Sequence, residues 1–232
     1  MRTIEAKFNF LPSLHIMQSS NKVIAIDGPA ASGKSSVSTI VSERTGFLHV
    51  NSGLMYRALT WSVLKVGIDP KDESNVIEHL NSIDLECVKV NGSLCLQIDG
   101  FDPEEQLKSP EVNNSVSIVS AIEEVRSELV KKQRNYLLIS NIVMEGRDIG
   151  SVVFPDTPFK FYIDASPEVR AQRRRGEGGV DDLAERDKMD SSRKVSPLVI
   201  PEDAVVIDTS EMNLDEVVDK VISELNSKGF NI

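Results

Sequence analysis

The sequence predicts an α/β fold in which a doubly wound parallel sheet is flanked by helices and carries a small β insertion. Short apolar runs alternate with helical segments along most of the chain, and this alternation is typical of a parallel sheet. Two alternating segments around Asn91-Gly92 interrupt that order and indicate an inserted β-hairpin. A glycine-rich loop, GPAASGKS at residues 28–35, directly follows the first buried run.

The expected strands of the main sheet are the short apolar runs. They lie at residues 22–27, 47–50, 141–145, 159–164 and 204–208. The expected helices lie at residues 33–46, 54–67, 72–80, 110–134, 166–175 and 213–229, with a further one between Arg186 and Arg193. Gly46 and Gly229 stand at helix C-termini, and Pro167 stands in a first turn.

The hairpin insertion, residues 84–110, contains both cysteines of the chain. The Asn-Gly dipeptide suits a type I′ turn, and this turn sets Val88 opposite Cys95 and Cys87 opposite Leu96. The two cysteines then point to opposite faces, so we expect no disulfide between them. Reduced cysteines of this kind fit the cytoplasm.

Composition excludes several functional classes. The 232 residues carry a formal net charge of −10, which argues against a nucleic-acid partner or an anionic membrane surface. No apolar run is long enough to span a bilayer, and residues 1–20 lack the apolar stretch of a signal peptide. We interpret residues 1–20 as an extension without fixed structure, with Met17 as an alternative start, and we expect a monomer.

The glycine-rich loop matches the pattern G-x-x-x-x-G-K-[ST] between a strand and a helix. Such a loop directs backbone N–H groups and a helix N-terminus at phosphate. Lys34 can reach the β- and γ-phosphates, and the Ser35 hydroxyl can ligate Mg²⁺. A chance match is the alternative, but the flanking strand and helix favour a P-loop NTPase fold that binds a nucleoside triphosphate. The predicted ATP-binding residues of the loop are Gly28, Pro29, Ala30, Ala31, Ser32, Gly33, Lys34, Ser35 and Ser36.

The arginines indicate what is done with the nucleotide. Arg57 and Arg147 each lie just past a predicted strand, where open parallel sheets bind their ligands. More arginines lie near the segment RRRGEGGVDD, which is interrupted by glycines. We expect this region, residues 174–184, to be a mobile lid. For Arg170 and Arg175 a solvated helix face explains the pattern equally well. Two facing phosphorylated ligands need such a set of cations, so the pattern favours phosphoryl transfer between nucleotides.

The chain resembles the bacterial cytidylate kinases, P-loop enzymes that transfer phosphate from ATP to CMP or dCMP. The similarity runs from about Val23 to the last predicted helix. It is carried by IDGPAASGKSS, NSGLMYRAL, VSIVSAIEEVRSELVKKQR, MEGRDIGSVVFPD, YIDASPEVRAQRR, ERDKMDSSRKVSPL and VVIDTS. Asn51 and Glu145 stand where that family commonly has aspartate, and the lid is short.

The resemblance implies roles for individual residues. Ser52, Ser117, Arg126 and Asp148 would read cytosine, Arg57 and Arg147 would hold the monophosphate, and Arg186 and Asp190 would contact the ribose. Arg193 would reach the transferred phosphate, and the implied catalytic set is Lys34, Arg147, Arg186 and Arg193. Arg174 joins the ATP-binding residues, and the Glu145 carboxylate would hold Mg²⁺ through water. A carboxylate suits cytosine because it accepts from the C4 amine and repels the O4 of uracil.

Other interpretations of these residues remain open. Ser117 can be a small helix residue, Arg126 can pair with Glu123 or Glu124, and Asp148 can be a helix N-cap. At the level of function, the rivals are a P-loop kinase for UMP, AMP or dephospho-coenzyme A, and a nucleotide-dependent switch. The sequence contains neither the Asp-x-x-Gly nor the Asn-Lys-x-Asp that a GTPase switch needs.

Overall fold

The computed structural model describes residues 4–7, 21–90, 93–176 and 183–230. The chain divides into two compact units. One comprises residues 1–18 and 52–133, and the other comprises residues 19–51 and 134–232. The predicted lid therefore lies largely outside the described residues, as do Asn91 and Gly92 of the predicted hairpin turn.

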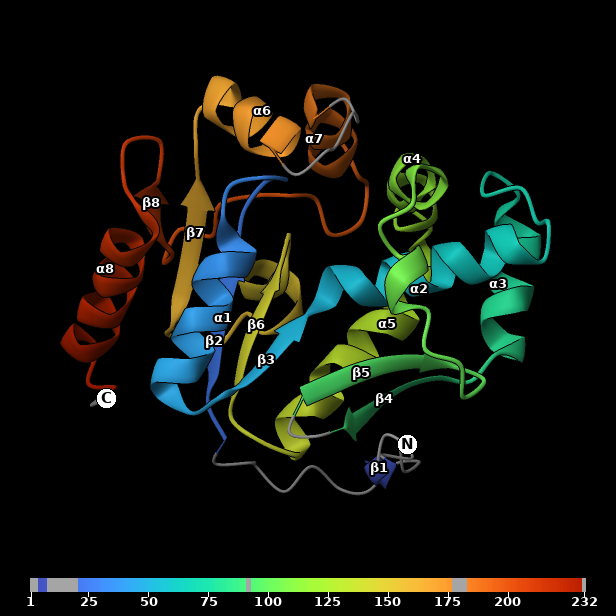
Figure 1. The fold of residues 1–232 in the computed structure, drawn as a ribbon, viewed down its shortest axis with the longest axis horizontal. Helices are drawn as coiled ribbons and strands as arrows, with labels where there is room; N and C mark the ends of the chain where they lie inside the picture. Colours follow the sequence, from blue (N-terminus) through green and yellow to red (C-terminus); the bar gives the residue numbers. More distant parts are fainter. Residues whose placement is uncertain (1–3, 8–20, 91–92, 177–182, 231–232) are drawn as a thin grey trace. The chain divides into compact units, whose positions relative to one another are not determined.

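The unit of residues 19–51 and 134–232 is built on a five-stranded sheet in the order β3-β6-β2-β7-β8 (Figure 1). All four neighbouring strand pairs are parallel, as predicted. The strands are β2 (Val23–Asp27), β3 (Leu48–Asn51), β6 (Ile142–Gly146), β7 (Lys160–Asp164) and β8 (Val205–Asp208). Its helices are α1 (Lys34–Thr45), α6 (Pro167–Gly176), α7 (Leu183–Ser191) and α8 (Leu214–Ser227), and short 3₁₀ and π segments are η2 (Tyr136–Leu138) and η3 (Ile149–Val153).

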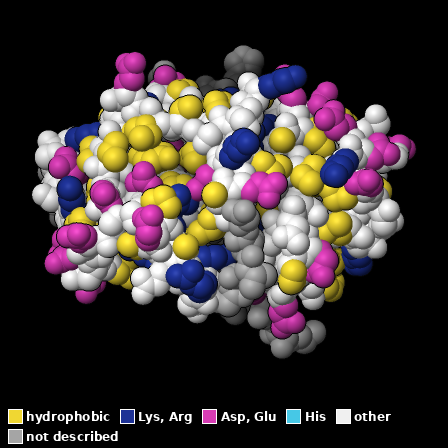
Figure 2. All heavy atoms as spheres, turned by 90° about the horizontal axis from the view of Figure 1, so that it is seen from above, with side chains coloured by type: hydrophobic (Ala, Val, Ile, Leu, Met, Phe, Trp, Pro, Cys, Tyr) yellow, Lys and Arg dark blue, Asp and Glu magenta, His cyan; other side chains and the backbone are white. Residues whose placement is uncertain are grey.

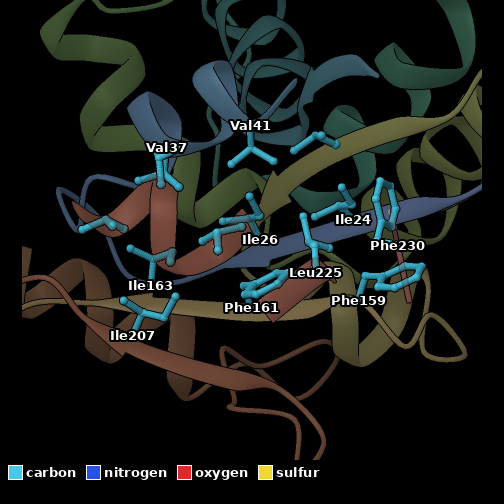
Figure 3. Close-up of a cluster of buried hydrophobic side chains, with 14 residues drawn as sticks. Ile24, Ile26, Val37, Val41, Phe159, Phe161, Ile163, Ile207, Leu225 and Phe230 are labelled. Carbon is cyan, nitrogen blue, oxygen red and sulfur yellow. The ribbon is translucent and has the colours of Figure 1, made fainter. Parts of the chain in front are cut away.

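The main core of this unit lies between the sheet and the helices α1 and α8 (Figure 3). Side chains of β2 and β7, such as Ile24, Ile26 and Phe161, meet Val37 and Val41 of α1 and Leu225 of α8. All of these side chains are at most 1% exposed. A strand buried on both faces reads as a continuous apolar run, which is why the sequence located β2 and β6 so clearly.

The unit of residues 1–18 and 52–133 combines helices with a three-stranded antiparallel sheet in the order β1-β4-β5. Its elements are β1 (Ile4–Lys7), α2 (Ser52–Lys65), α3 (Glu73–Ser82), β4 (Leu85–Val90), β5 (Ser93–Ile98), η1 (Glu104–Gln106), α4 (Pro110–Val119) and most of α5 (Glu123–Asn135). The predicted hairpin register is confirmed, since Val88 pairs with Cys95 and Cys87 with Leu96.

Two expectations differ from the structure. Residues 1–20 were expected to lack regular structure, but residues Ile4–Lys7 form β1, which pairs antiparallel with β4. The single helix expected over residues 110–134 is two helices, α4 and α5, interrupted at Ser120–Ile122. The last turn of α4 tightens because the Ala121 N–H donates to the Ile118 carbonyl three residues back. The Arg126 guanidinium donates a hydrogen bond to the Ser120 carbonyl at the same break.

Candidate active site

The phosphate loop, residues 28–35, joins the end of β2 to α1, and its glycines are required by its geometry. Gly28 has φ +154°, and a Cβ there would lie 2.1 Å from the Ile163 carbonyl oxygen of β7. Gly33 has φ +93°, which a side chain rarely adopts, and α1 starts at the next residue. The loop therefore turns sharply, and the N-terminus of α1 opens onto it.

Lys34 is buried at the base of this loop. Its Nζ donates to the Pro29 carbonyl at 3.0 Å, which folds the side chain back along the loop. Burial, and next the Arg147 guanidinium, lower the pKa of Lys34 to about 7. Nearby negative charges do not offset the cost of burying the Lys34 ammonium. An anionic phosphate would stabilise this ammonium, so the site favours a phosphorylated ligand.

Ser35 and Glu145, the two predicted Mg²⁺ residues, are in contact. The Ser35 hydroxyl donates to Glu145 Oε2 at 2.6 Å, and Glu145 lies on β6, next to β2 in the sheet. His49 Nε2 of β3 lies 3.2 Å from Glu145 Oε1. Burial opposes ionisation of Glu145, but His49, Lys34 and Ser35 outweigh it and hold its pKa below the ordinary value. An ionised carboxylate beside a hydroxyl is a donor set that suits Mg²⁺.

A second cluster follows β6. Arg147 Nε donates to Asp190 Oδ2 of α7 at 2.8 Å, and Arg193 also donates to the Asp190 carboxylate. Burial opposes ionisation of Asp190, but Arg147, Arg193 and, to a smaller extent, Arg186 hold its pKa below the ordinary value. Arg186 is half-buried on α7 and adds to the effects of burial and Arg147 that lower the pKa of Lys34. Thus the four residues of the implied catalytic set, Lys34, Arg147, Arg186 and Arg193, lie in one unit and share electrostatic partners.

Arg173 of α6 is a contact of the phosphate loop that the sequence analysis did not select. Its guanidinium donates to the Ser32 carbonyl at 3.0 Å and to the Thr209 hydroxyl and carbonyl, each at 2.9 Å. These residues line a cavity of about 380 Å³ beside the loop, with Val37 and Leu214. Arg174, which was predicted to bind ATP, is half-buried on the same helix.

Arg170 of α6 settles one question that the sequence left open. It is buried, and its guanidinium donates to the Ala30 carbonyl of the phosphate loop at 3.2 Å and to Asp187 of α7 at 2.5 Å. A solvated helix face, one of the two interpretations of Arg170, is therefore wrong. Arg175 is exposed, in agreement with that interpretation.

Four predicted acceptor residues, Ser52, Arg57, Ser117 and Arg126, lie in the unit of residues 1–18 and 52–133. Arg126 is 2% exposed, donates to the Ser120 carbonyl at 3.1 Å, and holds its guanidinium 5.2 Å from the centre of the Tyr56 ring. An ordinary surface pair with Glu123 or Glu124 does not fit such burial. Arg57 donates to the Leu107 carbonyl and to Asn113 Oδ1. Ser52 and Ser117 are both buried.

Asp148 is buried at the N-cap position of η3, but its side chain makes no capping hydrogen bond. The carboxylate of Asp27, the last residue of β2, accepts from the first N–H groups of η3 instead. Sequence reasoning thus missed Asp27, His49 and Arg173. A usable signal existed for Asp27, because a carboxylate that ends a fully buried strand needs hydrogen-bond partners.

Within the described ranges, no cluster of three or more His, Cys, Asp and Glu side chains could hold a metal ion. A cation at Ser35 and Glu145 would thus draw further ligands from phosphate or water. Across the same part of the chain, none of the helices has the length and apolar character needed to cross a membrane.

A parallel sheet with a phosphate loop after β2, a buried lysine and a hydroxyl–carboxylate pair defines the class of P-loop phosphotransferases. Within that class, the chain belongs to the cytidylate kinase family, whose family model, "Cytidylate kinase", matches residues 24–227.

Similar proteins bear the same name. The chain is 44% identical to a cytidylate kinase from Clostridium botulinum (strain Loch Maree / Type A3), across 88% of this chain and 97% of that protein. It is 42% identical to a cytidylate kinase from Caldanaerobacter subterraneus subsp. tengcongensis, across 89% and 96%. Among solved structures, it resembles a gluconokinase from Sinorhizobium meliloti 1021 with a TM-score of 0.49 and 14% identity, across 92% of this chain and 96% of that chain.

Proposed function

We propose that this chain transfers the γ-phosphoryl group of ATP to CMP or dCMP and releases ADP and CDP or dCDP. The observation that carries the proposal is the convergence, in one unit, of the phosphate loop with the Arg147–Asp190–Arg193 cluster. A hydrolase or switch needs cations for one triphosphate only. The additional arginines match the needs of a second phosphorylated ligand.

The proposed roles of the residues draw support from their positions. The loop amides and Lys34 bind the β- and γ-phosphates, and Lys34 gains a stable charge as the phosphates approach. Arg147 and Arg193 neutralise the charge that spreads over the transferred group, while Asp190 keeps their guanidinium planes oriented. The acceptor phosphate is already an anionic nucleophile, so no strong general base is needed.

Mg²⁺ fits the pair formed by Ser35 and Glu145, because their oxygens lie 2.6 Å apart beside the phosphate loop. The residues that would hold the ion are the Ser35 hydroxyl, directly, and the Glu145 carboxylate through water. When bound, the ion supplies positive charge to the phosphate oxygens of ATP.

Recognition of cytosine is assigned to the four residues that the resemblance implies. Asp148 accepts from the C4 amine, and Arg126 donates to N3 or O2. Ser52 and Ser117 complete the set that the resemblance assigns to the cytosine edge. Support comes from burial: Ser52, Ser117, Arg126 and Asp148 are all at most 6% exposed, so their polar groups read a base with little competition from water. The resemblance likewise assigns Arg57 and Arg147 to the acceptor phosphate.

The donor base would occupy the cavity beside Arg173 and Thr209, whose apolar lining includes Val37 and Leu214. The lid of residues 174–184 would close over the donor, with Arg174 at its start.

ATP and cytidine monophosphates are metabolites of the cytoplasm, and we assign the enzyme to that compartment. We expect it to act as a monomer, which sedimentation of the purified chain would check.

The decisive experiment measures ADP release with ATP and Mg²⁺ and one acceptor at a time: CMP, dCMP, UMP, AMP or dephospho-coenzyme A. Strong turnover with CMP or dCMP and weak turnover with UMP is the expected result. Equal turnover with UMP would refute the assignment of Asp148 and Arg126. Tight ATP binding without turnover of any acceptor would refute the kinase and favour a nucleotide-dependent switch.

A further inference from the structure

Asp27 links the phosphate loop to the segment that carries Arg147 and Asp148. It is the last residue of β2 and immediately precedes Gly28. Its carboxylate is 2% exposed, and its two oxygens accept from the N–H groups of Ile149 at 2.8 Å and Gly150 at 2.7 Å. The first N–H groups of a helix have no partner within that helix, so one carboxylate satisfies two of them at the start of η3.

We propose that Asp27 is a positioning residue of the phosphoryl transfer: it fixes the segment Arg147–Gly150 at the entrance of the phosphate loop, so that Arg147 and Asp148 are set for the acceptor nucleotide. This inference rests on the proposed function, because it takes Arg147 and Asp148 to bind the acceptor. Asp27 acts through their backbone and touches neither substrate.

Close packing on both sides of Asp27 makes this link stiff. A Cβ on Gly150 would lie 3.2 Å from Cγ and Cδ of Lys160 and 3.4 Å from Asp27 Oδ2, so the backbone at residue 150 sits against both side chains. Lys160 is itself fixed by the Pro155 carbonyl and the Asp203 carboxylate. On the other side, Gly28 packs against the Ile163 carbonyl too tightly for any side chain. The Gly28 end of the link therefore cannot shift without moving β7, and the Gly150 end is held by the Lys160 side chain.

The protonation state of Asp27 supports the same role. Burial raises the pKa of Asp27 to about 7, although the amides of Gly150 and Ile149 lower it. The charged and titratable groups around it are Arg147 and Asp148 from the linked segment, and Lys160 and Tyr162 from β7. A neutral carboxyl accepts two N–H groups more weakly than a carboxylate, so acidification through pH 7 should loosen the link.

The test compares wild type with D27N and G150A. The amide of D27N retains one acceptor oxygen but turns an N–H₂ group toward the second N–H donor. G150A places a Cβ 3.2 Å from Cγ and Cδ of Lys160, so the segment and the Lys160 side chain must move apart by a few tenths of an ångström, while the Asp27 carboxylate stays intact. For both variants we expect the KM for CMP to rise roughly 10-fold or more, while the Kd for a non-hydrolysable ATP analogue, measured without acceptor, changes less than about threefold.

D219N is the matched control, because it removes an exposed carboxylate that pairs with Arg44 and is not part of this link. Its KM for CMP should equal that of wild type. A pH series adds a readout that a merely structural role would not move: the ratio of KM for D27N to KM for wild type should fall between pH 8 and pH 6. The titration of CMP itself cancels in this ratio.

A lower melting temperature in D27N and G150A with an unchanged KM for CMP would overturn the inference and leave Asp27 a structural residue. Should D27N fail to fold, G150A decides alone by the same criterion. Absence of CMP turnover in the wild-type enzyme is a different result, because it would refute the proposed function and this inference with it.

Discussion

Asp190 is the residue on which two arginines of the site converge. Burial alone would raise the pKa of its carboxyl, but Arg147 and Arg193 outweigh this effect and hold the pKa below its usual range. A carboxyl whose pKa is depressed by folding contributes stability above its unfolded pKa of about 4. That contribution is lost as the pH falls through the folded pKa.

We therefore expect D190N to lower the free energy of unfolding at pH 7 by about 3–5 kcal/mol, because two largely buried guanidinium groups each lose a carboxylate partner. Below about pH 4 the difference between D190N and wild type should shrink. Urea denaturation at a series of pH values measures both effects. D156N, which removes an exposed carboxylate, serves as control, and an equal loss in D156N at pH 7 would contradict the argument.

Asp148 offers the sharpest test of base selection. An amide in place of its carboxylate can donate to O4 of uracil as well as accept from the amine of cytosine. We expect D148N to lower the ratio of kcat/KM for CMP to that for UMP by about 100-fold, with the KM for ATP unchanged. Parallel assays with both acceptors measure the ratio. A ratio like that of wild type would show that Asp148 does not read the base.

At the scale of single residues, the sequence predicted those that belong to a recognisable motif. The phosphate loop follows from its pattern alone. Ser35 and Glu145, each predicted to hold Mg²⁺, are in contact in the structure although 110 positions separate them. Asp27, His49 and Arg173 were missed because each acts through a contact that only the folded sheet creates. His49, for example, reaches Glu145 only because β3 pairs with β6.

At the scale of the element, α8 is the helix whose start is best defined. Asn213 accepts from the Glu216 N–H at 3.0 Å, and the Glu216 side chain accepts from the Asn213 N–H at 2.8 Å, which together form a capping box. We expect N213A to lower the free energy of unfolding by about 1 kcal/mol, while N213D keeps the acceptor and most of the stability. Thermal and urea unfolding measure both variants, and equal losses in the two would contradict the cap.

Some helix boundaries could be predicted from single residues in the sequence, and others could not. Gly46 marked a helix end because glycine readily adopts the left-handed conformation found there, and Pro167 marked a helix start because its ring fixes φ at a value that suits the first turn. The break between α4 and α5 has no proline or glycine. It depends on Arg126 donating to the Ser120 carbonyl, a contact between two turns that periodicity cannot reveal.

At the scale of the whole molecule, the dominant property is a formal net charge of −10. Figure 2 shows Asp and Glu side chains scattered over the face in view, with Lys and Arg between them. Exposed pairs such as Arg44–Asp219 contribute little, whereas the Arg147–Asp190 pair is largely buried and weakly screened by salt. Added salt should therefore weaken surface repulsion more than it weakens the attractive pairs.

We accordingly expect the midpoint of thermal unfolding to rise by about 2–4 °C, equivalent to about 1 kcal/mol, between 20 and 300 mM NaCl. Chloride is the appropriate anion, because phosphate or sulfate would bind at the phosphate loop and stabilise the fold by occupying the site. NaCl and KCl should act equally if screening is the cause. A midpoint that falls with either salt would mean that attractive surface pairs, rather than the excess of acidic groups, dominate the electrostatic free energy of folding.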